Sequence, residues 1–256
     1  MPIGDFMKNT LIILLTGIIV ISGCAKEQQA TIEPAPRVVT VPAFAKAAVS
    51  AVGGEKAWAD TEVIVGECTA KFYRPDNSFY LTRQRHAVYP WSDSVRIYAS
   101  EPQGTFVWQL TGDDLTLLEG TSRQAAKLPI TLCDPSIARA LWSIMAAPAS
   151  LAANVTPAAA ALGEAIRVEG LWHYPVELGN SRTWYLGKDT GIFDIYRLGV
   201  SGKPAFLTVR GYDYRTIEKT NIMVPAKIEI FTAKTSGSEL QRIIEFNYHT
   251  LESVGF

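Results

Sequence analysis

The sequence predicts an α+β fold that consists mainly of antiparallel β-strands. Apolar and polar residues alternate over most of the chain from residue 62 onward, and the alternating segments are short and separated by turn residues. Residues 42–52 and about 134–163 are instead apolar at helical spacing, which adds helices to the prediction. The chain has 256 residues and is 48% hydrophobic, which is enough for one domain with a substantial core.

An apolar run starts at Leu11, just after the basic residue Lys8, and ends at a cysteine. It is shorter than the about 20 apolar residues that a membrane-spanning helix needs, and it is typical of a secretory signal peptide. The last four residues, Ile21-Ser22-Gly23-Cys24, resemble the lipobox of bacterial lipoproteins. The resemblance implies that residues 1–23 are a signal peptide and that Cys24 carries a diacylglycerol thioether. A chance cysteine in an ordinary signal peptide or membrane anchor is the alternative.

Residues 24–40 are predicted to be a flexible tether, because they are polar, contain prolines and show no apolar period. Residues 41–256 are then a single domain. The formal net charge is −1, and removal of residues 1–23 leaves it unchanged because they contain one Lys and one Asp. This balance gives no reason to expect nucleic acid as a partner.

The domain begins with a predicted helix from Pro42 to Val52, in which proline suits the first turn and Gly53-Gly54 marks the end. A further helical turn over residues 55–60 carries Trp58. Five strands follow, joined by short turns in the pattern of an antiparallel meander. They are predicted at residues 62–72, 79–89, 95–99, 106–110 and 115–119.

The alternation stops at about 134–163, where we expect a helical insertion. Asp134-Pro135 combines a capping side chain with a first-turn proline, and Ile137, Leu141 and Met145 form an apolar stripe. Pro148 is expected to end this helix, and a second short helix is expected at 158–162. Strands resume at 165–169, 172–178, 183–187, 192–198, 205–215, 224–232 and 240–248.

This order of elements, together with three segments, resembles the periplasmic lipoprotein carrier and receptor family (LolA/LolB-like). Residues 183–192, Thr-Trp-Tyr-Leu-Gly-Lys-Asp-Thr-Gly-Ile, are similar to the family's Trp-Tyr-Leu-Asp-x-x-Thr-Gly stretch. Residues 211–215 and 224–228 are similar to its tyrosine-rich strand and to the proline that begins its next strand. The resemblance covers about residues 43–250. It implies a strongly curved sheet, an unclosed β-barrel covered by short helices, with an apolar and aromatic space between them that can hold acyl chains.

The aromatic and apolar side chains of the strands and of the helical insertion are the candidates for lining such a space. The candidate ligand-binding residues are Phe79, Leu81, Trp108, Leu110, Trp142, Met145, Trp184 and Leu186. The alternative is that these side chains are simply core. Two further cysteines, Cys68 and Cys133, either form a disulfide, which an exported protein can keep, or are small buried hydrophobic residues.

The sequence lacks the patterns of catalytic and metal sites. His86, His173 and His249 are far apart and have no paired ligand spacing. Asp113-Asp114 lies in a turn, where Asp is favoured for its backbone hydrogen bonds. No nucleophile elbow, zinc-protease motif or phosphate-binding glycine loop occurs. We therefore expect no metal, no cofactor and no enzymatic activity, and a periplasmic hydrolase is the weakest hypothesis.

The leading hypothesis is a lipoprotein of the bacterial cell envelope that is anchored in a membrane, faces the periplasm, and binds a lipid or other apolar ligand between sheet and helices. A role in envelope lipid or lipoprotein trafficking fits this hypothesis. Ala25 is not the aspartate associated with inner-membrane retention, which favours the outer membrane. The rival hypothesis is a structural or sensing lipoprotein with a self-filled core that binds a partner protein of the envelope through its outer face.

Overall fold

The computed structural model describes residues 41–102, 104–121, 134–154, 161–177, 182–199, 206–233 and 240–255. All of these residues belong to one compact unit. The predicted signal peptide, the tether and Cys24 therefore lie outside the described residues.

Three helices are described: α1 (Val41–Ala51), α2 (Glu55–Ala59) and α4 (Pro135–Asn154). Among the described segments, no helix has the length and apolar character to cross a membrane. Helix α1 is followed by Gly53, whose φ is 119° and where an added Cβ would lie 2.5 Å from the carbonyl oxygen of Asn221. Only glycine fits this close contact between the segment after α1 and the turn that contains Asn221. The Trp58 indole then donates a 3.0 Å hydrogen bond back to the carbonyl of Val52.

All strands belong to one 13-stranded sheet with the order β5-β4-β3-β2-β1-β13-β12-β11-β10-β9-β8-β6, and β7 pairs with β8 beside this path. All the pairings are antiparallel. The two end strands, β5 and β6, do not pair with each other, so the sheet is unclosed. The strands are β1 (Thr61–Tyr73), β2 (Phe79–Tyr89), β3 (Ser94–Glu101), β4 (Gly104–Thr111), β5 (Asp114–Glu119), β6 (Ala161–Leu162), β7 (Ile166–Val168), β8 (Leu171–Glu177), β9 (Arg182–Gly187), β10 (Phe193–Gly199), β11 (Phe206–Thr216), β12 (Met223–Ala233) and β13 (Gln241–Gly255).

The sheet consists of two meanders that meet at β1 and β13. Strands β1–β5 form the first meander and β8–β13 the second, and the pair β1–β13 joins them over the register Thr61↔Gly255 to Phe72↔Ile244. The first and last strands of the domain are therefore neighbours in the middle of the sheet. This arrangement is mainly antiparallel α+β, as the alternation predicts, and its sheet is unclosed and curved, as the family resemblance implies.

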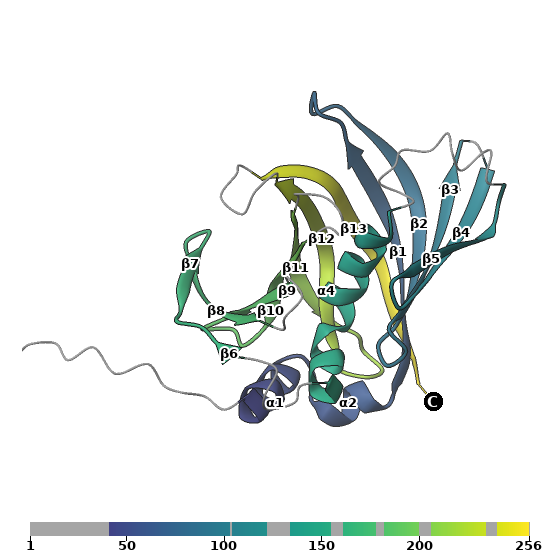
Figure 1. Ribbon diagram of the computed structural model, residues 1–256. Helices are drawn as coiled ribbons and strands as arrows, with labels where there is room; N and C mark the ends of the chain where they lie inside the picture. The colour runs from purple at the N-terminus through teal and green to yellow at the C-terminus, as the bar shows by residue number, and fades with distance from the viewer. Residues whose placement is uncertain are drawn as a thin grey trace, which may run out of the picture. The chain divides into compact units, whose positions relative to one another are not determined.

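Helix α4 lies on the concave face of the sheet, which we call the inner face (Figure 1). It contacts β2–β5 on one side and β10–β12 on the other. On β1 the inner side chains are those of even number, from Ile64 to Phe72, and they are buried, whereas Glu67, Thr69 and Lys71 are on the opposite, outer face. The inner side chains of the strands and the buried residues of α4 and α1 form one hydrophobic cluster.

The helical insertion differs from the prediction in two ways. First, α4 is one helix of 20 residues that continues through Pro148, where the sequence analysis ends it. Proline removes one backbone hydrogen bond, but the alanine-rich sequence on both sides favours helix, and residues 137–146 are held by burial against the sheet. Second, Ala161–Leu162 are in β6 and not in a second helix, because they pair with Val176 and Glu177 of β8. The predicted start is confirmed, since the Asp134 carboxylate accepts a 2.8 Å hydrogen bond from the amide of Ser136.

Candidate functional site

Six of the eight predicted ligand-binding residues lie together on the inner side of the fold, in the buried cluster between α4 and the sheet. Trp142 and Met145 come from α4, and the other four come from both meanders. The six residues are Trp108, Leu110, Trp142, Met145, Trp184 and Leu186. The cluster therefore joins the two halves of the sheet through the helix.

The other two predicted residues, Phe79 and Leu81, lie on the outer face of β2 and are 50% and 55% exposed. Phe79 packs beside the ring of Tyr73 at a centroid distance of 5.8 Å, away from α4. The prediction that they line the space between sheet and helix is thus at odds with the structure. The reason is that the inner side of β2 is polar, so that apolar alternation points to the wrong face of this strand.

Polar contacts hold α4 to one rim of the sheet. Arg139, the single charged residue of α4, is buried and pairs with Asp93 in the β2–β3 turn and with Asp113 in the β4–β5 turn. Its guanidinium also donates to the carbonyl of Gly112. One turn further along, the Trp142 indole donates a 3.1 Å hydrogen bond to the carbonyl of Tyr89. We call these contacts of Arg139 and Trp142 the α4 clasp.

A buried polar group lies on the inner face of β1, β2 and β13. His86 Nδ1 is 2.7 Å from the Tyr248 hydroxyl, and Nε2 is 2.8 Å from Gln84 Oε1. Burial lowers the pKa of His86 to about 3, so the imidazole is neutral. Since Gln84 Oε1 can only accept, Nε2 carries the proton and Nδ1 accepts the Tyr248 hydroxyl. A neutral, fully hydrogen-bonded imidazole is a structural element and not a general base at neutral pH.

Two atoms near this group are buried without a hydrogen-bond partner among the described residues: Gln84 Nε2 and Glu101 Oε1. Burial raises the pKa of Glu101, although a hydrogen bond with the Thr82 hydroxyl acts in the opposite direction. Buried polar atoms are normally paired, because leaving one unpaired costs about 1–3 kcal/mol. The inner face therefore offers a donor and a carboxyl oxygen next to its apolar cluster.

On the outer face, a ladder of charges crosses four strands. Lys71, Glu245, Glu229 and Arg210 are successive cross-strand neighbours on β1, β13, β12 and β11. Burial raises the pKa of Glu245, but hydrogen bonds from Lys71 and Asn247 and the nearby charge of Lys227 bring it down to about 2. The ladder is a structural network, because each carboxylate in it has cationic partners.

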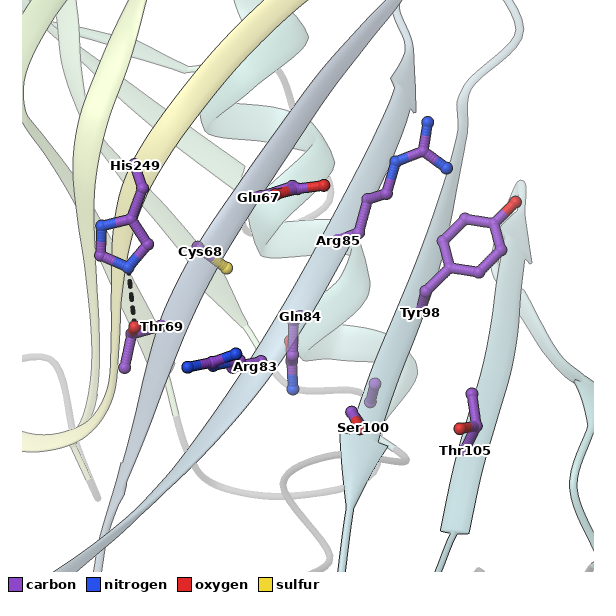
Figure 2. A pocket seen from close by; sticks show the side chains of 11 residues that line it. Glu67, Cys68, Thr69, Arg83, Gln84, Arg85, Tyr98, Ser100, Thr105 and His249 are labelled. Carbon is purple, nitrogen blue, oxygen red and sulfur yellow. Dashed lines mark hydrogen bonds between the residues drawn. The ribbon is translucent and has the colours of Figure 1, made fainter.

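A cavity of about 530 Å³ lies beside this ladder, on the outer face of β1–β4 and β13 (Figure 2). It contains Arg83, Arg85 and Tyr98, and its far side is formed by His249, which is 2.7 Å from the Thr69 hydroxyl. A second cavity of about 520 Å³, bounded by Arg215, Lys219 and Glu252 among others, also reaches His249. Figure 2 shows α4 behind the sheet, so the first cavity opens away from the helix.

Comparison with known proteins identifies the fold. No family model and no curated protein sequence matches the chain. Among solved structures, a LolA superfamily protein from Nitrosomonas europaea superposes with a TM-score of 0.53, over 85% of this chain and 95% of that chain, at 15% identity. The fold is LolA-like. The resemblance seen in the sequence is thereby confirmed at the level of the fold.

Two further solved structures superpose more loosely. A DUF1329 family protein from Desulfovibrio piger has a TM-score of 0.41, at 10% identity over 84% of this chain and 93% of that chain. A domain described as outer membrane lipoprotein-sorting, from Vibrio parahaemolyticus, has a TM-score of 0.40, at 8% identity over 83% and 91%. Their TM-scores are too low to carry an argument about this LolA-like chain.

The cysteines and histidines singled out in the sequence are the remaining candidates in the LolA-like domain. Cys68 is buried on the inner face, and burial raises the pKa of its thiol. Cys133 lies outside the described residues, so the predicted bridge stays a prediction. His173 is buried, and its Nε2 is 3.1 Å from the carboxylate of Asp194. Within the described ranges, no three His, Cys, Asp or Glu side chains gather as a metal site would need.

Sequence reasoning missed the α4 clasp and the polar group around His86. Arg139 had a visible signal, because it is the single charged residue in a long apolar helix. A charge in such a position requires a partner when the helix is buried. His86 and Gln84 had a weaker signal, since alternate polar residues on a strand usually indicate its solvent face.

Proposed function

We propose that this protein is a lipid-anchored lipoprotein of the bacterial envelope that binds a lipid or another apolar ligand between α4 and the inner face of its curved sheet. The observation that carries the proposal is an almost uncharged helix of 20 residues that lies on the concave face of an unclosed sheet. Binding and not catalysis is the role that such a site supports, because an apolar interface supplies burial and no reactive group.

The apolar part of the ligand belongs in the cluster between α4 and the two meanders. Trp108, Trp142 and Trp184 contribute large apolar surfaces there, from the first meander, the helix and the second meander. Burying an acyl chain contributes about 0.8 kcal/mol per CH₂ group, so a short length of chain is sufficient for useful affinity. Because the described side chains in this interface are packed against one another, a ligand gains room when α4 moves away from part of the sheet.

The polar end of the ligand belongs next to the buried polar group of the inner face. Gln84 Nε2 can donate a hydrogen bond, and Glu101 Oε1 is unpaired among the described residues. A ligand that brings an oxygen to Gln84 and a donor to Glu101 removes two desolvation penalties. This favours an amphipathic lipid over a plain hydrocarbon.

The anchor places this binding site at a membrane. In the proposal, Cys24 carries the lipid, residues 24–40 separate the domain from the membrane surface, and the domain faces the periplasm from the outer membrane. A protein in this position can take part in envelope lipid or lipoprotein trafficking. The support comes from the lipobox-like residues 21–24 and from the LolA-like fold.

Native mass spectrometry of the full chain purified from membranes tests the proposal. We expect a covalent mass increase on a chain that begins at Cys24, and a second, non-covalent lipid mass that is lost on denaturation. A chain that retains residues 1–23 contradicts the anchor. If no lipid is released and the protein also fails to bind dansylated undecanoic acid, the ligand-binding proposal is wrong.

The site itself is tested by energy transfer from tryptophan to the dansyl probe. Trp142 lies between α4 and the sheet, whereas Trp172 is 48% exposed on β8. Trp142→Phe is expected to reduce the sensitised dansyl emission, and the matched change Trp172→Phe is expected to leave it almost unchanged. An equal reduction in both variants would place the probe elsewhere.

A further inference from the structure

The cavity on the outer face, which the proposed function does not use, contains two arginines that lie side by side. Arg83 and Arg85 are two residues apart on β2, so both side chains leave the same face of the strand, about 7 Å apart. Both residues are exposed, and both line the cavity of about 530 Å³ (Figure 2).

Aromatic stacking holds one of these arginines in place. The Arg85 guanidinium carbon lies 5.6 Å from the centre of the Tyr98 ring. The Tyr98 hydroxyl accepts a 3.5 Å hydrogen bond from Arg96, which lies on the same outer face. Stacking on a ring orients the planar guanidinium while leaving its N–H groups free to bind. The cavity therefore contains a guanidinium whose orientation is fixed and whose N–H groups remain available to bind a ligand.

Several other cations of the outer face form ion pairs, unlike Arg83 and Arg85. Lys71, Lys227 and Arg242 share the carboxylates of Glu245 and Glu229, and Arg210 pairs with Glu169. In the described part of the chain, by contrast, no carboxylate lies within ion-pair distance of Arg83 or Arg85. Even Glu67, which is opposite Arg85 in the β1–β2 register, makes no ion pair with it. The cavity thus holds two guanidinium groups that no described carboxylate neutralises.

We infer that this cavity binds an extended acidic segment of a partner protein. Alternate side chains of an extended peptide leave the same side of its backbone with the spacing that separates Arg83 from Arg85. Two carboxylates at alternate positions can therefore each meet one guanidinium, in the planar geometry that arginine and carboxylate share. The hydroxyls of Thr69, Ser100 and Thr105 line the same cavity and can donate to remaining carboxylate or peptide oxygens.

The charges favour a peptide over an anionic membrane surface as the occupant. Lys/Arg clusters that recognise anionic lipids typically contain about four to eight cations. The cavity contains two, with Glu67 beside them, and the chain as a whole has a formal net charge of −1. Two oriented guanidiniums at fixed spacing suit discrete carboxylates better than a diffuse negative surface.

Fluorescence anisotropy with the full chain tests this inference. The probe is a fluorescein-labelled peptide Glu-Val-Glu-Val-Glu, and the control peptide is Gln-Val-Gln-Val-Gln. We expect the acidic peptide to bind more tightly, to weaken as ionic strength rises, and to lose affinity about tenfold or more in the double variant Arg83→Gln/Arg85→Gln. Arg74→Gln, an exposed arginine in the β1–β2 turn outside the cavity, is the matched control and is expected to leave the affinity unchanged.

Three results would overturn the inference. They are equal binding of the two peptides, unchanged binding in the double variant, or Arg83- and Arg85-dependent binding to phosphatidylglycerol vesicles without binding of the acidic peptide. Both arginines are exposed, so the variants are expected to keep the unfolding midpoint of the parent, which is measured alongside. Binding of dansylated undecanoic acid on the inner face is independent of these changes, so failure here leaves the proposed function standing.

Discussion

The α4 clasp makes a quantitative prediction about Arg139. In Arg139→Met a side chain of similar length keeps the buried apolar contacts but loses the ion pairs to Asp93 and Asp113 and the hydrogen bond to the Gly112 carbonyl. Charge-assisted hydrogen bonds contribute about 1.5–3 kcal/mol each when well sheltered. Here Asp93 is 48% and Asp113 82% exposed, so water replaces much of what the carboxylates lose.

We therefore expect the free energy of unfolding to fall by about 2 kcal/mol in Arg139→Met, most of it from Asp93 and Gly112. The measurement is urea unfolding of the full chain followed by tryptophan fluorescence. Arg182→Met is the matched control, because Arg182 reaches Asp113 at 3.8 Å and is 36% exposed. Its effect is expected to stay below about 0.5 kcal/mol.

The same variant connects stability with the proposed function. If α4 must move for a ligand to bind, weakening the clasp makes the open arrangement more accessible, and dansylated undecanoic acid binds faster to Arg139→Met than to the parent chain. Equal unfolding free energies for Arg139→Met and Arg182→Met would refute the reasoning about the clasp. A lower free energy with an unchanged binding rate would instead refute the movement of α4.

Three other predictions follow from the packing and the charges. The pKa of Glu245 is lowered from 4.5 to about 2, so its ionised carboxylate contributes fully to the free energy of unfolding above pH 4.5, and this contribution is lost as the pH falls towards 2. Glu245→Gln should remove up to about 3 kcal/mol of this pH dependence, measured by urea unfolding across that range. Gly66→Ala would bring a Cβ to 2.5 Å from the Tyr248 ring, and should destabilise the protein by about 1–3 kcal/mol in the same assay at neutral pH; an unchanged midpoint would contradict the packing there. Trp108→Ala should lower the free energy of unfolding by about 3–5 kcal/mol, and Phe79→Ser should lower it by less than about 0.5 kcal/mol. Similar losses in the two variants would mean that the inner and outer faces of the sheet are wrongly assigned.

Alternation was a reliable guide where one face of a strand is apolar and the other polar. On β1, β3 and β4 alternate residues face the inner side of the sheet and are buried there. The rule failed on β2, where Thr82, Gln84 and His86 are buried on the inner face and Phe79 is exposed on the outer face. The hydrogen bond between His86 and Tyr248 joins strands that are far apart in the sequence, and no local pattern reports it.

The helical insertion shows a second limit. A proline is a local signal, and Pro148 predicts the end of a helix, yet the backbone of α4 continues to Asn154. The helix is held by tertiary contacts with both meanders, which local propensity does not include. The candidate site was predictable as a set of apolar residues on the strands and helix. Its polar neighbours, Gln84 and Glu101, were not, because their burial depends on what the rest of the sheet places around them.

The pairing of β1 with β13 bears on how the chain acquires its fold. Each meander can form from neighbouring segments of sequence, but the register from Thr61↔Gly255 onward requires the final residues of the chain. Closing a loop of this length carries an entropic penalty that only the completed interface repays. A chain that is made from its N-terminus thus lacks this central strand pair until β13 is available. The two halves of the sheet therefore join late, and loss of β13 is expected to be far more damaging than loss of an edge strand.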